Sequence, residues 1–207
     1  GAAINGVGDI NGDGINDFAI SAPNSSSSGK VYVVFGDSRA ELNSLPSLDS
    51  LNGTDGIILS ETGTTQLGGE VSGIGDFNGD GVDDFVVGAT GGVGAAYVVF
   101  GRSGITNLTT DDLFGDVAAN FIDDGFLIFG AGLGSSVAAA GDVNGDGLDD
   151  LLLGANVSNN AYVLFGTSTP TDLLSNPNFF SSVGSSALVV DLTDGSDFSG
   201  NGRIDDG

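Results

Sequence analysis

The sequence predicts an all-β protein made of β-propeller blades, each a sheet of four antiparallel strands. Three observations predict this fold: an apolar segment that recurs at a fixed period, other segments that recur with it, and a composition of 37 Gly and only 4 Pro in 207 residues. The tyrosines Tyr32, Tyr97 and Tyr162 lie 65 residues apart, in KVYVVFG, AAYVVFG and NAYVLFG. A fixed period of this length is typical of propellers and other repeat proteins.

Each repeat begins with two strands separated by an acidic loop. The first strands, AINGVGD, EVSGIGD and SVAAAGD, end at Asp9, Asp76 and Asp142. The second strands follow the loop as DFAISAP, DFVVGAT and DLLLGAN. All are short runs rich in Val, Ile, Leu, Phe and Ala, bounded by Gly, Asp, Asn or Ser, which is the pattern of β-strands. Several lack polar alternation, so we expect both of their faces to be covered.

The third and fourth strands complete each repeat. The third contains the tyrosine, and the fourth is GIILS at residues 56–60 and GFLIF at residues 125–129. In the last repeat ALVVDL, from Ala187, is either the fourth strand or the strand that comes after it. The longest connections follow the third strand, as at residues 102–124, and are rich in Ser, Thr, Asn and Asp. We expect them to be surface loops with room for a helical turn.

These segments divide the chain into three blades and a fraction. The blades comprise residues 1–64, 65–130 and 131–184, of which the third is shortened, and residues 185–207 form a partial or capping blade. Propellers typically have at least four blades, so we expect an open arc or a part of a larger propeller. A β-sandwich is the competing all-β fold, but its strands need not recur as near-identical sequences.

A nine-residue acidic loop joins the first two strands of each repeat. Its copies are DINGDGIND (residues 9–17), DFNGDGVDD (76–84), DVNGDGLDD (142–150) and a weaker DFSGNGRID (197–205). Oxygen-bearing side chains fall at positions 1, 3, 5 and 9, and glycine falls at position 6. Hard cations need six to eight oxygen ligands, which a short loop supplies by curling around the ion. The pattern therefore predicts cation sites.

Calcium is the predicted ion. Three carboxylates and one amide in each of the first three loops favour Ca²⁺ over Mg²⁺, which prefers small octahedral sites that keep several waters. Position 6 can adopt the positive φ of a sharp turn, because it is Gly14, Gly81, Gly147 or Gly202. The backbone carbonyl at position 7 adds a candidate ligand from Ile15, Val82, Leu148 and Arg203. We expect three calcium ions, and a fourth if the weaker loop binds, and we expect them to stabilise the fold.

Two other interpretations of the loops are weaker. Asp, Asn and Gly are common in turns, but three aligned copies between matching strands exceed what turn formation needs. In the fourth copy Ser199 and Asn201 replace Asn and Asp, so a plain turn and a weak site stay equal alternatives there. An EF-hand needs Glu at loop position 12 and flanking helices, whereas position 12 is Ile20, Val87 or Leu153 inside a predicted strand.

The chain resembles the FG-GAP repeats that form the blades of integrin α-subunit propellers and of many bacterial extracellular proteins. The resemblance rests on the acidic loops and on dipeptides near the ends of the second and third strand segments: Ala22-Pro23 with its counterparts Gly88-Ala89 and Gly154-Ala155, and Phe35-Gly36, Phe100-Gly101 and Phe165-Gly166. It implies that each loop joins the two inner strands of a blade and binds Ca²⁺ on one rim. The side-chain ligands that it implies are Asp9, Asn11, Asp13 and Asp17, then Asp76, Asn78, Asp80 and Asp84, and then Asp142, Asn144, Asp146 and Asp150. The weaker loop offers Asp197, Ser199, Asn201 and Asp205 at the same positions.

Composition excludes several classes of function. The chain has 4 Lys and Arg against 28 Asp and Glu, a net charge of −24, so nucleic acid and anionic membranes are not expected partners. It has no His and no Cys, which removes the imidazole base, the thiol nucleophile and the usual zinc ligands. Its apolar runs are too short to insert across a membrane. The acidic pairs Asp111-Asp112 and Asp123-Asp124 are interpreted as solvated loop charges rather than catalytic pairs.

We therefore predict a non-enzymatic, calcium-binding module of the extracellular space or cell surface, used in adhesion, recognition or surface architecture. Its expected partners are calcium and either an extracellular protein or glycan, or the chain itself. One alternative is a subunit that joins head to tail into a filament or surface layer through incomplete terminal blades. A second alternative is an accessory domain of a secreted hydrolase.

Overall fold

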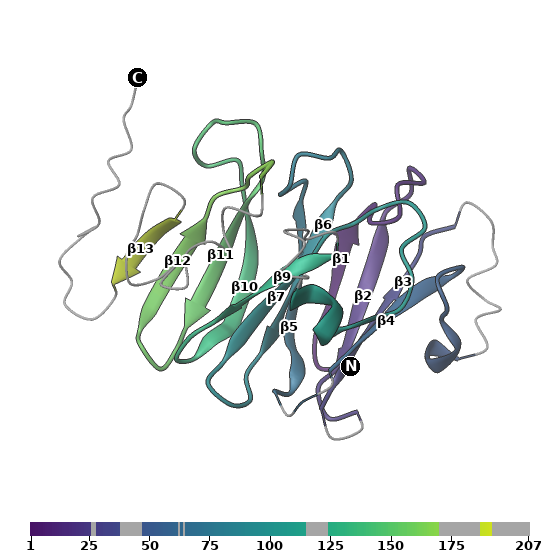
Figure 1. The fold of residues 1–207 in the computed structure, drawn as a ribbon, viewed down its shortest axis with the longest axis horizontal. Helices are drawn as coiled ribbons and strands as arrows, with labels where there is room; N and C mark the ends of the chain where they lie inside the picture. The colour runs from purple at the N-terminus through teal and green to yellow at the C-terminus, as the bar shows by residue number, and fades with distance from the viewer. Residues whose placement is uncertain are drawn as a thin grey trace.

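The computed structural model describes residues 1–25, 28–37, 47–61, 63, 65–114, 124–169 and 187–191. These residues form three sheets that stand side by side in chain order (Figure 1). The main strands are β1 (Ile4–Gly8), β2 (Asp17–Ala22), β3 (Lys30–Val34) and β4 (Gly56–Ser60); β5 (Leu67–Gly75), β6 (Asp84–Ala89), β7 (Ala95–Val99) and β9 (Gly125–Phe129); and β10 (Leu133–Gly141), β11 (Asp150–Ala155), β12 (Asn160–Leu164) and β13 (Ala187–Asp191). Each set of four is antiparallel, and no described sheet closes on itself. The prediction of four-stranded blades in an open arc is confirmed.

The three sheets share one register, which settles the place of the last strand. Each tyrosine on the third strand lies opposite an apolar residue on the second strand and another on the fourth. The pairs are Tyr32 with Ile20 and Ile58, Tyr97 with Val87 and Leu127, and Tyr162 with Leu153 and Val189. Residues 187–191 are therefore the fourth strand of the third blade. The boundary expected after residue 184 is too early, because it cuts this strand from its sheet.

The connection after β7 packs against the first sheet as well as linking β7 to β9. Within it β8 (Leu108–Thr109) pairs in parallel with β4 of the first sheet, and η3 (Thr110–Phe114) is a 3₁₀ turn. The predicted helical turn is present, but the expectation of a surface loop is wrong for part of the segment. Ile105 and Leu113 are each 1% exposed and pack in the cluster between the first two sheets. Burial of these apolar side chains is favoured because it removes apolar surface from water.

The apolar core lies between the sheets. One cluster joins the first and second sheets through side chains such as Val7, Val31 and Phe85, and another joins the second and third through Phe77 and Leu151. Every residue of β6 and β7 is buried, whereas burial alternates along β2. The middle sheet is covered on both faces, which is why its strands lack polar alternation in the sequence.

The first strand of each sheet lies at the inside of the arc and ends in an irregularity. Strand β5 contacts both β1 and β10. Pairing with the second strand shifts register just before each acidic loop, at Gly8, Gly75 and Gly141, where φ is between +67° and +79°. This β-bulge bends the strand and directs the chain into the loop.

No helix among the described residues is long and apolar enough to cross a bilayer.

Candidate metal centre

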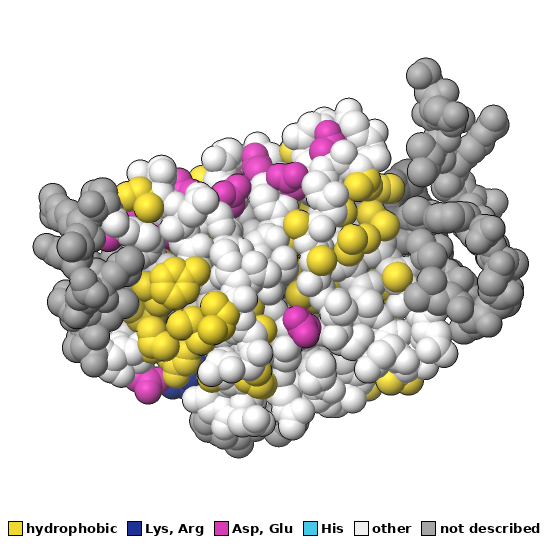
Figure 2. Space-filling model, turned by 180° about the vertical axis from the view of Figure 1, so that it is seen from behind, with side chains coloured by type: hydrophobic (Ala, Val, Ile, Leu, Met, Phe, Trp, Pro, Cys, Tyr) yellow, Lys and Arg dark blue, Asp and Glu magenta, His cyan; other side chains and the backbone are white. Residues whose placement is uncertain are grey.

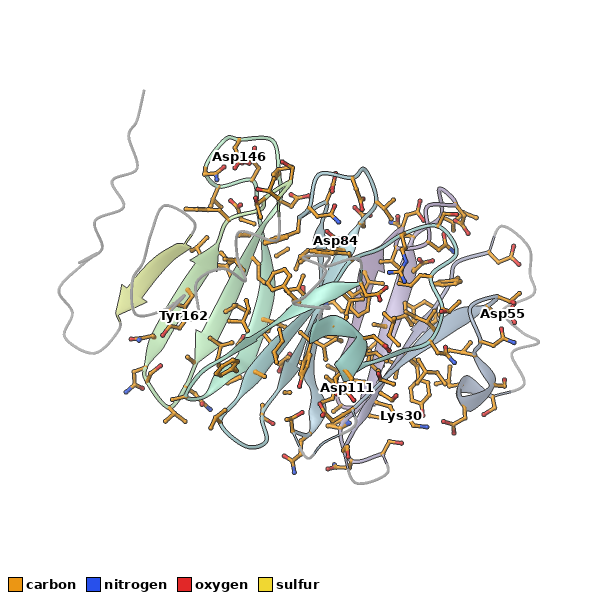
Figure 3. All side chains as sticks on the ribbon, in the orientation of Figure 1. Lys30, Asp55, Asp84, Asp111, Asp146 and Tyr162 are labelled. Atoms are coloured by element: carbon orange, nitrogen blue, oxygen red, sulfur yellow. The ribbon has the colours of Figure 1, made fainter. Side chains whose placement is uncertain are left out.

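The first three acidic loops lie at the same end of the three sheets. They connect β1 to β2, β5 to β6 and β10 to β11, as the resemblance implies for strands at the inside of the arc. Figure 3 shows Asp146 at the tip of the third loop and Asp84 where the second loop enters β6. Figure 2 shows acidic side chains along this edge of the molecule. The candidate ligands of the three loops are thereby placed on one rim.

The carboxylate at position 1 organises each loop. Asp9 accepts hydrogen bonds from the backbone N–H groups of Gly12 at 2.9 Å, Asp13 at 3.0 Å and Gly14 at 2.6 Å. Asp76 and Asp142 accept the corresponding three bonds at 2.7–3.1 Å. The loop therefore curls around its first residue, as the pattern predicts.

Positions 3 and 5 form a second layer of oxygen atoms. In the first loop Asn11 Oδ1 accepts from the N–H of Asp13 at 2.9 Å, and Asp13 Oδ1 accepts from the N–H of Ile15 at 2.8 Å. The second and third loops repeat both bonds at 2.9 Å. The side chains at position 5 remain exposed. They are therefore accessible to an ion that arrives from solvent.

The carboxylate at position 9 is buried and joins the loop to the end of the third strand. Asp17, Asp84 and Asp150 are 0–2% exposed. In each, one oxygen accepts from the N–H at position 2, at 2.8–3.0 Å, and the other accepts from the N–H of the Phe-Gly glycine, at 2.7–2.9 Å. A Cβ on any of these glycines would collide with the backbone carbonyl at position 8 of the acidic loop in the same blade. The recurrent Phe-Gly dipeptide therefore has a structural role in holding the loop. From the sequence it served only as a mark of the family resemblance.

Burial leaves the position-9 carboxyls with raised pKa values. Loss of hydration raises the pKa of Asp17 to about 6 and that of Asp84 to about 8, and it also raises the pKa of Asp150. The charge of Asp80 adds to the rise at Asp84, while the N–H of Gly101 opposes it. In the described part of the chain, both ion pairs, Lys30–Asp49 and Arg102–Asp124, lie outside the loops.

The glycines at position 6 have the conformation that the sequence predicts. Gly14, Gly81 and Gly147 have φ of +89°, +87° and +91°. A Cβ at these positions would meet nothing within 4 Å. Glycine is therefore required here by the backbone angle and not by lack of space. Positions 12 of the loops lie inside β2, β6 and β11, which agrees with the exclusion of an EF-hand.

The donor set fits a hard cation, although its oxygen atoms do not already converge. Among the residues that the structure describes, no three acidic side chains gather in metal-binding geometry. Their oxygens accept hydrogen bonds from the N–H groups of their own loop and, at position 9, from the Phe-Gly glycine. Carboxylate and amide oxygens within one tight curl are nonetheless the ligands that Ca²⁺ prefers. Asp9, Asn11, Asp13 and Asp17 and the carbonyl of Ile15, with their counterparts in the next two loops, are the residues that would hold it.

The other acidic candidates lie apart from these three loops in the sequence. Residues 197–205, with the candidate ligands Asp197, Ser199, Asn201, Arg203 and Asp205, lie outside the described residues. Asp123 of the second acidic pair lies outside them as well, while Asp124 forms an ion pair with Arg102. Asp111 and Asp112 are exposed in the first turn of η3. Asp112 accepts bonds from the backbone and hydroxyl of Thr109.

Sequence reasoning gave no role to position 8 of the loops. Asp83 Oδ2 accepts a hydrogen bond from the N–H of Asp9 at 2.8 Å, and Asp149 Oδ2 accepts from the N–H of Asp76 at 3.1 Å. Each of these bonds crosses from one blade to the loop of the preceding blade. The signal in the sequence is weak: position 8 is acidic only in the second and third loops, and it is Asn16 in the first.

The fold and the loops define a class of protein, a propeller-type repeat module in which each blade presents an acidic loop on one rim. Comparison with protein families matches the FG-GAP repeat to residues 2–34, 68–99 and 133–164. The chain belongs to the FG-GAP repeat family. It is 30% identical over 174 residues to integrin alpha-4 of Xenopus laevis, an alignment that covers 79% of this chain and 15% of the integrin. The chain is thus an integrin-like β-propeller module that spans a small part of that relative.

Proposed function

We propose that this module binds calcium in its three acidic loops and acts, without catalysis, in adhesion, recognition or architecture outside the cell or at its surface. One observation carries the proposal: three loops repeat the same curl of carboxylate and amide oxygens, each ending in a buried carboxylate whose pKa is raised. A divalent cation would offset the mutual repulsion of these charges. The likeness to an integrin supports the extracellular setting.

Thermal unfolding with calcium and with a chelator tests the proposal. Three sites with dissociation constants of roughly 10⁻⁴ M, at about 1 mM calcium, would together raise the midpoint by about 8–17 °C. An unchanged midpoint would contradict the proposal. The triple variant Asp13→Ala, Asp80→Ala, Asp146→Ala should lose the shift. A matched variant that removes three exposed acids elsewhere, Asp55→Asn, Glu70→Gln and Asp111→Asn, should keep it.

The absence of catalysis is also testable. The acids of the loops accept backbone hydrogen bonds, and in the exposed pair Asp111-Asp112 the carboxylate of Asp112 accepts from Thr109 at the start of a short turn. We expect no turnover on a panel of glycosides and phosphoesters with calcium present. Turnover that disappears in an acid-to-amide variant would instead favour the accessory or catalytic domain of a hydrolase.

Head-to-tail self-association is a second candidate function, favoured by the outer face of the third blade. Val143 at loop position 2 is 52% exposed and Leu152 on β11 is 39% exposed, whereas their counterparts in the second blade, Phe77 and Val86, are fully buried against the third blade. A face that no described element covers suits another blade. Light scattering over a range of protein concentrations in calcium should show growth beyond the monomer. A monomer at every concentration would remove this candidate.

A further inference from the structure

We propose that Asp83 and Asp149 couple the calcium sites of neighbouring blades, so that an ion in one loop strengthens binding in the preceding loop. The inference rests on the proposed calcium function and adds a regulatory relation between its sites. It assigns these two residues a positioning role, since neither is a candidate ligand.

The contact has the same form at both blade junctions. At the first junction the carboxylate of Asp83 accepts from the N–H of Asp9 at 2.8 Å, and the N–H of Asp83 donates to the carbonyl of Asp9 at 3.3 Å. At the second junction Asp149 makes both bonds to Asp76, at 3.1 and 3.2 Å. One residue of each later loop is thus bonded twice to position 1 of the loop before it.

The backbone around the contact is shaped to admit it. Gly8 and Gly75 precede position 1 with φ of +79° and +72°, and a Cβ on either would overlap the incoming carboxylate of Asp83 or Asp149. A side chain from the later loop also lies over position 4 of the earlier one. A Cβ at Gly12 would be 3.7 Å from Val82, and a Cβ at Gly79 would be 2.9 Å from Leu148.

A third bond fixes position 2 of the earlier loop. The N–H of Arg102 donates to the carbonyl of Ile10 at 2.9 Å, and the N–H of Thr167 donates to the carbonyl of Phe77 at 2.9 Å. The residue that donates follows the Phe-Gly glycine, which is itself bonded to the position-9 carboxylate. The earlier loop is therefore held at position 1 by position 8 of the later loop, and at position 2 by the residue that follows the Phe-Gly dipeptide of the later blade.

The location of Asp83 explains how coupling would arise. It lies between Val82, whose carbonyl is a candidate ligand, and Asp84, whose carboxylate is another. An ion in the second loop would immobilise this segment and, through Asp83, the residue that begins the first loop. Binding to a loop that is already ordered costs less conformational entropy, and the effect is reciprocal. Position 8 of the first loop, Asn16, is exposed and serves as a matched control.

The test reports on one loop at a time. Since the chain has no Trp, Ile15→Trp supplies the first loop with its own sensitiser for terbium luminescence, with terbium as the probe for calcium. Emptying the second loop with Asp80→Ala should then weaken terbium binding in the first loop about fivefold or more. In an Asp83→Ala background the same change should have no such effect. Asp83→Asn keeps a side-chain acceptor and should preserve the coupling, as should Asn16→Ala.

Each outcome bears on a separate statement. A first loop that fails to bind terbium at millimolar concentration, before Asp80 is changed, overturns the calcium function and the inference with it. Binding that Asp80→Ala leaves within twofold overturns the coupling and leaves the calcium function standing. A weakening of equal size with Asp83 intact and in the Asp83→Ala background overturns the role of Asp83, because a long-range charge effect would act in both.

Discussion

The amide of Asn107 attaches the connection after β7 to Ile58 in the outer strand of the first sheet. Its Oδ1 accepts a hydrogen bond from the N–H of Ile58 at 2.8 Å, and its Nδ2 donates to the carbonyl of Leu51 at 2.9 Å. Beside it, Leu59 and Leu108 are paired across β4 and β8. Two blades that are consecutive in sequence are therefore joined at their periphery as well as through their core.

Replacing Asn107 tests this peripheral junction. Asn107→Ala removes both bonds and should lower the free energy of unfolding by about 1–2 kcal/mol. Asn107→Asp keeps the acceptor for Ile58 and loses the donor to Leu51, so it should fall between the alanine variant and the parent. Urea unfolding in calcium measures all three. An alanine variant as stable as the parent would show that the amide bonds contribute nothing.

The glycines before the loops provide a matched pair. Gly75 and Gly141 occupy the same repeat position with φ of +72° and +67°, so alanine at either incurs the cost of a left-handed backbone, about 1–2 kcal/mol. Only at Gly75 does the added Cβ overlap a carboxylate from the next blade. Gly75→Ala should therefore destabilise by about 1–3 kcal/mol more than Gly141→Ala in chemical denaturation. Equal losses would mean that the second and third blades can move apart at Gly75 to admit the Cβ without a loss of stability.

Loop positions 5 and 9 should respond differently to alanine. Asp84 is buried and accepts from the N–H groups of Phe77, Asn78 and Gly101, so Asp84→Ala should cost about 2–4 kcal/mol even in chelator. Asp80 is exposed, and Asp80→Ala should cost less than about 1 kcal/mol in chelator.

In calcium the comparison should change, because each variant lacks one of the proposed ligands. Asp80→Ala should then fall further below the parent than it does in chelator. Unfolding curves of the parent and the two variants, each with and without calcium, separate the role in the fold from the role in binding. A cost of Asp80→Ala that is the same in both buffers would count against a bound ion in the second loop.

Loop position 2 distinguishes a covered blade from an uncovered one. Phe77 is fully buried and its ring lies 5.8 Å from that of Phe126, centroid to centroid. Phe77→Ala should cost about 3–5 kcal/mol. The equivalent Val143 is 52% exposed, and Val143→Ala should change stability by about 0.5 kcal/mol or less. Differential scanning calorimetry of dilute protein measures both, and a large loss for Val143→Ala would indicate that its face is covered in solution.

Local features of the fold were predictable from the sequence because each depends on neighbouring residues. The strands around Tyr32, Tyr97 and Tyr162 have a clear apolar pattern with turn residues at their ends. The positive φ of Gly14 and Gly81 follows from a sharp turn that only glycine adopts without strain.

Features that depend on how blades lie against each other were not predictable. The bond from Asp83 to Asp9 spans 74 residues, and a carboxylate at position 8 carries no sign of its partner. The pairing of β8 is two residues long, too short for a periodic pattern. Ile105 and Leu113 are apolar residues in a polar segment, and only the neighbouring sheet decides that they are buried.

The parallel pairing of β8 with β4 has a consequence for synthesis on the ribosome. A growing chain that has released β4 presents it as an open edge, which invites contact with other nascent chains. Among the described residues, this edge gains a strand partner, along Leu59 and Ser60, only when Leu108 and Thr109 emerge, after β5, β6 and β7 have already been made. The first blade is thus completed by a strand from the second. If translation stopped after β4 but before β8, the first sheet would be prone to aggregation through its open edge, although all four of its own strands would be in place.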